Sequence, residues 1–272
     1  MESAKLMKLY DRVDRIHHEL RALGIADDAT LDVRQLAQFD QYHYHGTDAV
    51  DLAAARLGLD AASHVLDVGA GIGGPARWLA ATTGCRVTAI ELQPDLNETA
   101  ADLTRRAGLA DRVTHVAGNI LDGAPEAGAY DALISYLVFL HIPDRARLFA
   151  ACHRALRPGA GMYIEDFTLL SEPTAEQREA LRVKVQCPYV PSPDVYRQDI
   201  AGAGFASIDF EDVTEEWTAF TAERAAAFRS SRERQVRVHG AEVAAGLEDF
   251  FETMAGLYAD GVLGGARILA RR

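Results

Sequence analysis

Short apolar runs alternate with amphipathic segments through the middle of the chain. The runs are apolar on both faces and predict strands at residues 64–69, 86–92, 112–118, 130–138 and 161–167. The segments between them have helical periodicity and predict helices at residues 74–81, 94–107 and 144–156. Such alternation is typical of an α/β fold in which helices cover both faces of a parallel sheet. The ligand site of such a sheet lies at the carboxyl ends of its strands.

An apolar seam marks the first predicted helix. It consists of Leu6, Leu9, Val13, Ile16, Leu20 and Leu23, which lie on one face of a helix that ends near Gly24. The seam either packs on its own domain or pairs with a second copy of the chain as a homo-oligomer. Two further helices are predicted, one over residues 31–39 behind a Thr30 cap and one from a Thr47 cap to Gly58.

The C-terminal part of the chain adds helices and two more strands. Helices are predicted at residues 174–184, 214–239 and 241–258 and behind the Ser192–Pro193 pair, and strands at residues 206–213 and 265–272. The predicted fold is therefore α/β: a Rossmann-like, seven-stranded, mostly parallel sheet with helices on both faces, an N-terminal helical lid and a C-terminal helical cap. We divide the chain into the lid or oligomerisation segment (1–46), the ligand-binding core (47–170) and the cap with the last two strands (171–272).

Composition and charge narrow the function classes. The net charge of −12 disfavours a nucleic-acid partner and stable association with an anionic membrane, since both would repel the protein. Three cysteines, Cys85, Cys152 and Cys187, form no CxxC pair and match no histidine spacing of a metal site, so no metal is expected. Without a signal-peptide pattern or a long apolar run, the protein is expected to be cytoplasmic.

A glycine-rich turn follows the first predicted strand of the core. Asp67, Gly69, Gly71 and Gly73 form the pattern D-x-G-x-G-x-G. Glu91 ends the next strand, where its carboxylate can accept hydrogen bonds from both hydroxyls of a ribose. This combination resembles motif I and the following acid of class I S-adenosylmethionine-dependent methyltransferases. The resemblance continues through "GNILD", "YDALIS" and "LFAACHRALRPGAGMYIED" and covers about residues 50–170.

The resemblance implies a cofactor and the residues that bind it. S-adenosylmethionine, which leaves as S-adenosylhomocysteine, would lie against the glycine turn, with Glu91 on its ribose. Asn119 would contact the adenine amino group and Ile120 would pack on the adenine ring. Leu92 and Leu137 would complete the apolar walls.

The acceptor side is predicted from two histidine-containing segments. His141, in "SYLVFLHIPD", has a pKa range that suits a base near neutral pH. A similar segment is found in phosphoethanolamine and sarcosine/dimethylglycine N-methyltransferases, which implies a small-molecule acceptor. These families also imply that "FDQYHYHG" is a lid, with Tyr42 and His45 as catalytic candidates and His43 and Tyr44 as substrate-binding candidates.

The rings of the lid have a purely structural alternative, in which they pack the N-terminal helices on the sheet. If successive side chains of this segment point to opposite sides, two of the four rings face the pocket and the other two face outward or the core. Tyr189 and Tyr196 are further candidates for the pocket wall, whereas Trp217 and Phe220 are expected in the core. Glu165 could contact an amine or stabilise a carbocation.

Four functions stay open at this point. The first is N- or O-methylation with a histidine base, and the second is C-methylation of an isoprenoid alkene through a carbocation, as in the loosely similar sterol-type C-methyltransferases. A nicotinamide-dependent dehydrogenase is disfavoured because no tyrosine is followed four residues later by lysine. A non-catalytic scaffold that holds S-adenosylmethionine is disfavoured by the polar rings of the lid.

Overall fold

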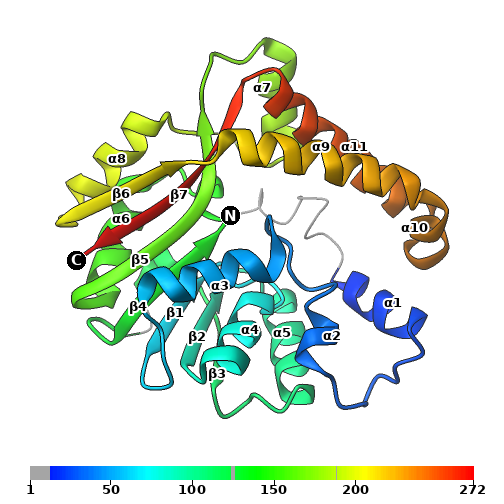
Figure 1. Ribbon diagram of the computed structural model, residues 1–272, viewed down its shortest axis with the longest axis horizontal. Helices are drawn as coiled ribbons and strands as arrows, with labels where there is room; N and C mark the ends of the chain where they lie inside the picture. The colour runs from blue at the N-terminus through cyan, green and yellow to red at the C-terminus, as the bar shows by residue number, and fades with distance from the viewer. Residues whose placement is uncertain (1–12, 124–125, 188) are drawn as a thin grey trace.

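The computed structural model describes residues 13–123, 126–187 and 189–272, and its strands form one sheet (Figure 1). The strands are β1 (His64–Val68), β2 (Arg86–Glu91), β3 (Val113–Ala117), β4 (Tyr130–Tyr136), β5 (Leu156–Leu169), β6 (Ser207–Asp212) and β7 (Leu263–Arg271). Their order is β3-β2-β1-β4-β5-β7-β6, with β7 antiparallel to both neighbours and the other pairs parallel. The predicted seven-stranded, mostly parallel sheet is confirmed.

The helices follow the predicted order along the chain. They are α1 (Asp14–Ala22), α2 (Val33–Leu36), α3 (Gly46–Leu57), α4 (Gly74–Thr83), α5 (Pro94–Arg106), α6 (Arg145–Ala155), α7 (Ala175–Val183), α8 (Pro193–Gly202), α9 (Thr214–Ser230), α10 (Arg232–His239) and α11 (Ala241–Ala259), with short 3₁₀ turns η2 (Ile120–Asp122) and η3 (Phe139–His141). Within these described ranges, none of the helices has the length and apolar character needed to cross a membrane.

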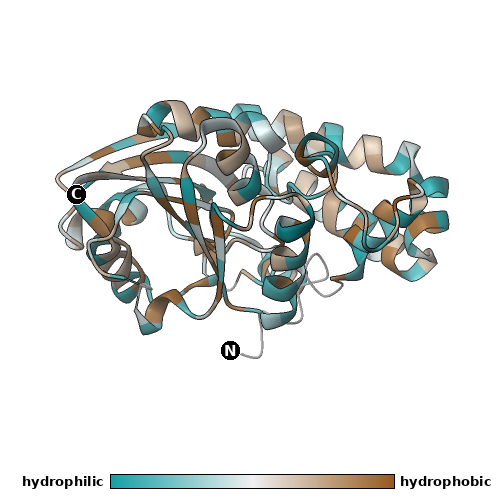
Figure 2. Cartoon of the chain, turned by 90° about the horizontal axis from the view of Figure 1, so that it is seen from below, coloured by the Kyte–Doolittle hydropathy of each residue, from teal (hydrophilic) through white to brown (hydrophobic). Residues whose placement is uncertain are grey.

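The two faces of the sheet bury different side chains because successive strand residues point to opposite sides. Val65 belongs to the cluster that includes residues of α3 and α4, whereas its neighbour Leu66 belongs to the cluster that includes residues of α6 and α8. Both side chains are fully buried. Figure 2 shows hydrophobic stretches along the strands, as expected for a sheet that is covered on both faces.

A third apolar cluster forms the cap, which α7, α9 and α11 build beyond the carboxyl ends of β4 and β5. Trp217 is completely buried in it, as predicted, and Phe220 packs against it. The lid residue Tyr44 also belongs to this cluster, and its ring centroid lies 4.8 Å from that of Trp217. Lid and cap therefore share one core although they come from opposite ends of the chain.

Three boundaries predicted from local signals are wrong. Asp32, and not Thr30, caps α2, since its Oδ1 accepts from the N–H of Arg34 and Gln35. Helix α3 starts one residue before Thr47, behind His45, which has a left-handed backbone (φ 58°). The long helix predicted over residues 214–239 breaks at Ser231, whose hydroxyl donates back to the carbonyls of residues 227 and 228.

The N-terminal seam packs on its own chain where the structure describes it. Ile16 and Leu20 are buried in a cluster with residues of α2 and α5 and with Ile72 of the glycine-rich turn. Leu23 is 45% exposed, while Leu6 and Leu9 lie outside the described residues.

Helix α1 is also joined to the far end of the cap. Glu19 accepts from Nε2 of His239 at 2.8 Å and from Nη1 of Arg234 at 3.1 Å, and both partners belong to α10. Figure 1 shows α10 at the tip of the arm that α9 and α11 form, next to α1. Burial opposes ionisation of Glu19, but the hydrogen bonds and charges of these partners outweigh it and lower its pKa to about 2.

We expect Glu19→Gln to destabilise the protein by about 1.5–3 kcal/mol at pH 7, because hydrogen bonds to a charged group are lost. The pKa of Glu19 is lower in the folded chain than in the unfolded chain. Its contribution is therefore complete above about pH 4.5 and decreases as the pH falls toward 2. Thermal unfolding between pH 7 and 3 checks this. The control Glu248→Gln removes an ion pair between Arg232 and Glu248 and should cost about 1 kcal/mol or less. A Glu19 effect no larger than the control would contradict the assignment.

Candidate donor and acceptor site

A cavity lies where the lid meets the carboxyl end of β1. It is lined by the lid residues Asp40, Tyr42 and His43, by Asp67, Gly69, Ala70, Gly71, Ile72 and Pro75 around the glycine-rich turn, and by Tyr136 of β4. The parallel register of β1 with β2 and β4 brings these strand ends together. The cavity therefore lies where ligands bind in open parallel sheets.

The glycine-rich turn is held against β2 by its own backbone. The N–H groups of Gly69 and Ala70 both donate to the carbonyl of Ile90, at 2.9 and 3.1 Å. A side chain at Gly69 would collide with Val138, whose nearest atom lies 2.4 Å from the position of a Cβ. Around Gly71, which has a φ of 54°, a Cβ would meet no atom within 4 Å. Open space for a ligand therefore lies next to Gly71.

Asp67 is buried at the start of this turn without a partner for one of its oxygens. The residue is 2% exposed, and its Oδ2 accepts no hydrogen bond. Burial, followed by the charge of Glu91, raises the pKa of Asp67 to about 7. A buried carboxyl group with an unpaired oxygen would be stabilised by a cationic ligand in the cavity.

Glu91 is fixed at the end of β2 by two backbone donors. Its Oε2 accepts from the N–H of Gly71 and its Oε1 from the N–H of Gln93, both at 2.9 Å. Burial raises its pKa, and these bonds partly offset the effect. Each carboxylate oxygen keeps a further lone pair, so the group can still accept from a pair of hydroxyls.

The other predicted cofactor residues surround the same strand ends. Asn119 caps η2, since its Oδ1 accepts from the N–H of Leu121 at 3.0 Å, and one acceptor position of this carbonyl remains. Ile120 is buried, whereas Leu92 is 40% exposed. Leu137 is buried with a left-handed backbone (φ 55°), and its N–H donates to the carbonyl of Glu165.

The structure separates the four rings of the lid. Tyr42 and His43 line the cavity, and the His43 ring stacks on Tyr136 with centroids 4.5 Å apart. Tyr44 lies in the cap core, and Nε2 of His45 lies 3.0 Å from Oε1 of Glu216. The two cavity residues are adjacent and not alternate, because the segment turns instead of forming a strand.

His43 has a defined tautomer. Its Nε2 lies 2.9 Å from the carbonyl oxygen of Gly46, which can only accept, so Nε2 carries the proton and Nδ1 is the acceptor. Burial lowers the pKa of His43 to about 4, and this ring is therefore neutral near pH 7.

His141 lies in η3, directly after β4, and also has a defined tautomer. Its Nδ1–H donates to the carbonyl of Gln186 at 2.9 Å, and its buried Nε2 has no partner. Burial lowers the pKa of His141, and the bond to Gln186 opposes this shift. The neutral ring thus presents an unprotonated nitrogen as a proton acceptor.

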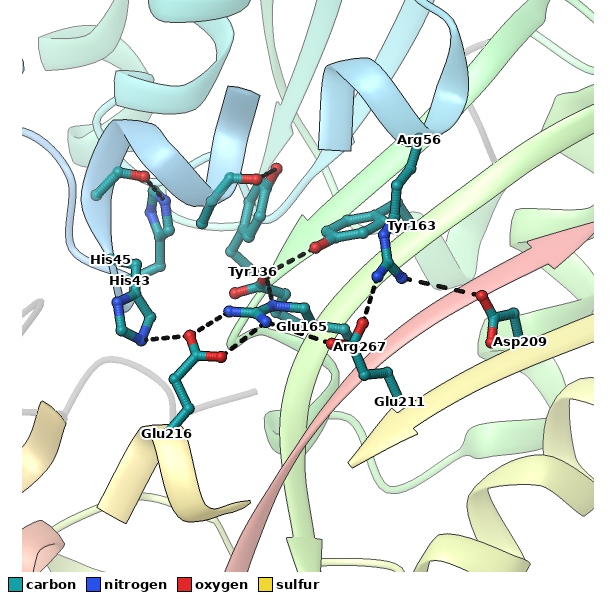
Figure 3. A network of polar contacts seen from close by, with 12 residues as sticks. His43, His45, Arg56, Tyr136, Tyr163, Glu165, Asp209, Glu211, Glu216 and Arg267 are labelled. Atoms are coloured by element: carbon teal, nitrogen blue, oxygen red, sulfur yellow. Dashed lines mark hydrogen bonds and ion pairs between the residues drawn. The ribbon is translucent and has the colours of Figure 1, made fainter. Parts of the chain in front are cut away.

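Glu165 lies in an ion-pair network and is absent from the cavity wall (Figure 3). Its Oε1 accepts from the hydroxyl of Tyr163 at 2.8 Å and from Nε of Arg267 at 3.0 Å, while its buried Oε2 has no partner. Arg267 also donates to Glu216, which contacts His45. The network therefore joins β5, β7 and α9 to the lid.

The two tyrosines predicted for the pocket wall lie elsewhere. Tyr196 is completely buried in the cluster on the α6 side of the sheet, where its hydroxyl donates to Asp166 and Arg145 stacks over its ring at 4.3 Å. Tyr189 is 42% exposed. Neither residue lines the cavity, and the same holds for the predicted site residues Glu91, Leu92, Asn119, Ile120, Leu137 and His141.

Sequence reasoning missed the residues that hold this site in place. Arg77 is completely buried on α4 and pairs with Asp40, and Gln186 sets the tautomer of His141. Arg77 lies one residue after the buried Ala76 and two before the buried Leu79, so its place on the helix face was a usable signal. Among the residues that the structure describes, no group of three or more His, Cys, Asp or Glu side chains could hold a metal ion.

Comparison with known proteins shows what the core of the chain is similar to. Residues 65–159 match the family model of a methyltransferase domain, so the chain contains such a domain. A glycine/sarcosine/dimethylglycine N-methyltransferase of Actinopolyspora halophila is 30% identical over 61% of this chain and 29% of its own length. A sarcosine/dimethylglycine N-methyltransferase of Halorhodospira halochloris is 33% identical over 58% of this chain and 56% of its own length. The matched part of the chain thus spans 29% and 56% of the length of these two relatives.

A solved structure has the same fold. Phosphoethanolamine N-methyltransferase 2 of Haemonchus contortus, in complex with S-adenosyl-L-methionine, superposes with a TM-score of 0.78 at 21% identity. The alignment covers 86% of this chain and 54% of that protein. The predicted Rossmann-like methyltransferase fold is confirmed, and the domain match favours a methyltransferase over the dehydrogenase alternative.

We expect Asp67→Asn to stabilise the ligand-free protein by about 1–3 kcal/mol at pH 8, because the cost of an ionised, buried carboxylate disappears. Burial in the folded chain raises the pKa of Asp67 to about 7, so the folded protein binds the carboxyl proton of Asp67 more tightly than the unfolded protein does. The penalty therefore grows as the pH rises from 4 to 7, and the gain should be small at pH 5. Thermal unfolding at both pH values checks this, with exposed Asp28→Asn as the control. A difference that does not depend on pH would contradict the prediction.

Proposed function

We propose that this protein is an S-adenosylmethionine-dependent methyltransferase that methylates nitrogen or oxygen of a small-molecule acceptor, with His141 as the base. One observation carries the base assignment. The carbonyl of Gln186 fixes the tautomer of His141, which leaves the buried Nε2 as an unpaired proton acceptor at the end of β4. The methyltransferase domain at residues 65–159 supports the reaction class.

The donor side of the cavity fits S-adenosylmethionine. Asp67 supplies a buried, unpaired oxygen for the cationic methionine end, and the open space at Gly71 lets that end approach the backbone. Glu91 has acceptor positions for the two ribose hydroxyls. Asn119 and Ile120 would hold the adenine, and Leu92, exposed in the ligand-free chain, would cover it.

When bound, the donor supplies an electrophilic sulfonium methyl group. The acceptor nitrogen or oxygen forms a bond to the methyl carbon while the carbon–sulfur bond breaks and its electron pair stays on sulfur. His141 takes the acceptor's proton on Nε2 and becomes an imidazolium. Tyr42 and His43 close the cavity against water and align the reactants.

We expect His141→Gln to lower kcat by about 10²–10⁴-fold, because the amide cannot accept the proton. The dissociation constant of S-adenosylmethionine should change less than about twofold. The pH profile of the wild-type enzyme should show an acidic limb below pH 6.5, since burial lowers the pKa of His141. Initial rates and calorimetry measure these quantities. His153→Gln serves as the control, since this partly buried histidine of α6 packs against Phe205 and is absent from the cavity lining. Equal rates for both variants would remove His141 from the mechanism.

We expect Glu91→Gln to weaken S-adenosylmethionine binding by about 10–100-fold, because two charge-assisted hydrogen bonds to the ribose become weaker. Calorimetric titration of the purified protein measures the affinity. Glu98→Gln, on the exposed face of α5, is the matched control. An unchanged affinity would show that the ribose lies elsewhere.

A second candidate is C-methylation of an isoprenoid alkene, and the aromatic cluster of the cap supports it. Tyr44 lies with Phe167, Trp217, Phe220 and Tyr258 at ring separations of 4.8–6.5 Å, and such ring faces stabilise cations. Transfer of a labelled methyl group to a pool of amines and phenols, against a pool of terpenoids, distinguishes the two functions. Label in the first pool supports methylation of nitrogen or oxygen, whereas label only in the second supports C-methylation.

A further inference from the structure

Arg77 is a charged side chain with no exposure to solvent. It lies on the first turns of α4 and donates from Nη2 to Oδ2 of Asp40 at 2.8 Å, and Asp40 is itself only 3% exposed. Its Nη1 donates to the carbonyl of Ala100 and to the hydroxyl of Thr104, both at 3.2 Å. Burial of a guanidinium is costly unless most of its hydrogen bonds are made, and these three bonds from Nη1 and Nη2 offset part of that cost, although the buried Nε has no partner.

The partner of Arg77 belongs to the lid. Asp40 immediately precedes the segment in which Tyr42 and His43 line the cavity, and Asp40 itself is part of the lining. Its Oδ1 also accepts from the side-chain amide of Gln41 at 2.8 Å. The ion pair therefore holds the residues that cover the donor cavity onto the helix that starts at its glycine-rich turn.

Two glycines of this turn make room for the attachment. A Cβ on Gly74 would lie 2.3 Å from the carbonyl oxygen of Asp40, which is too close for any side chain. A Cβ on Gly73 would lie 2.9 Å from Nη1 of Arg77 and 2.8 Å from Cε1 of His115. The contacts of Gly73 and Gly74 are with the lid and the buried arginine, whereas the open space lies at Gly71.

We propose that Arg77 and Asp40 are positioning residues, which fix the lid over the donor cavity through a contact that Gly74 permits. The turn that shapes the cavity therefore also positions the lid. Tyr42 and His43 are then held beside the methionine end of the proposed donor before the acceptor binds. This preorganisation lowers the entropic cost of closing the site. The role in methyl transfer rests on the proposed function, whereas the attachment of the lid does not.

Gly74→Ala tests the attachment without removing a charge. Alanine favours a helix over glycine, so the change should be harmless unless the lid needs this space. We expect amide hydrogen exchange of residues 39–46 to become at least tenfold faster in the ligand-free protein, while exchange of β1 and β4 stays unchanged. The matched control is Gly256→Ala in α11, where a Cβ would meet nothing within 4 Å, and lid exchange should not change there.

Asp40→Asn provides a second test, because it keeps the shape of the side chain and removes its charge. It should also accelerate exchange of residues 39–46, whereas Asp131→Asn, which breaks the partly exposed pair with Arg157, should not. The affinity for S-adenosylmethionine should fall about tenfold in Gly74→Ala. If Gly74 and Asp40 only stabilised the core, the two variants would instead accelerate amide exchange throughout α4 and β1.

The outcomes separate this inference from the proposed function. Lid exchange that stays at the wild-type rate in both variants, or rises equally over the whole core, overturns the positioning role even if the wild-type protein transfers methyl groups. Faster lid exchange in a protein that does not bind S-adenosylmethionine would support the attachment and contradict the proposed donor.

Discussion

The structure depends on the turn between β1 and α4, where neighbouring atoms leave no room for a side chain at two glycine positions. The backbone of this turn is pinned to β2 through the carbonyl of Ile90, and Val138 leaves no room for a side chain at Gly69. The carbonyl of Asp40 imposes the same limit at Gly74. The turn therefore organises the end of the sheet, the start of a helix and the lid, and the space that remains at Gly71 is where a ligand can approach the backbone.

Three contacts tie the lid and helix α1 to parts of the chain that are distant in the sequence. Asp40 ties the lid to α4, Tyr44 inserts into the core of the cap, and Glu19 joins α1 to the distant end of the α9–α11 arm. These contacts are a buried ion pair, an aromatic cluster and a partly exposed charge cluster, so they respond differently to pH and salt.

The pKa shifts of the acids and histidines around the site come mainly from burial and less from ion pairs. Burial raises the pKa values of Asp67 and Glu91, and for Asp67 the charge of Glu91 adds to the effect. Burial also lowers the pKa values of His43 and His141. The cavity wall thus contains the carboxyl group of Asp67, which resists ionisation, and the neutral imidazole of His43, while Glu91 and His141 lie outside the lining. These directions are the ones that the proposed function requires, since a cationic ligand stabilises a buried carboxylate and a neutral imidazole can accept a proton.

Glu165 shows that a place at the end of a strand does not by itself predict that a side chain faces the site. The residue ends up beside Tyr136 in the register of β4 with β5, close to the predicted site. Its carboxylate is nevertheless engaged by Tyr163 and Arg267, and Arg267 comes from β7, more than a hundred residues later in the chain. Only the antiparallel insertion of β7 next to β5 brings that arginine to the acid.

The sequence by itself determined the sheet and the order of its helices, and it predicted the donor side of the site, because strand and helix periodicity and the glycine pattern are local signals. Local chemistry also marked His141 as a titratable group at a strand end. The tertiary structure decided which rings face the cavity, since the path of residues 40–46 is set by Arg77, the cap core and Glu216 and not by alternation. It also decided that Tyr196 is a core residue and which nitrogen of His141 is free, because Asp166 and Gln186 come from distant segments whose approach no local pattern encodes.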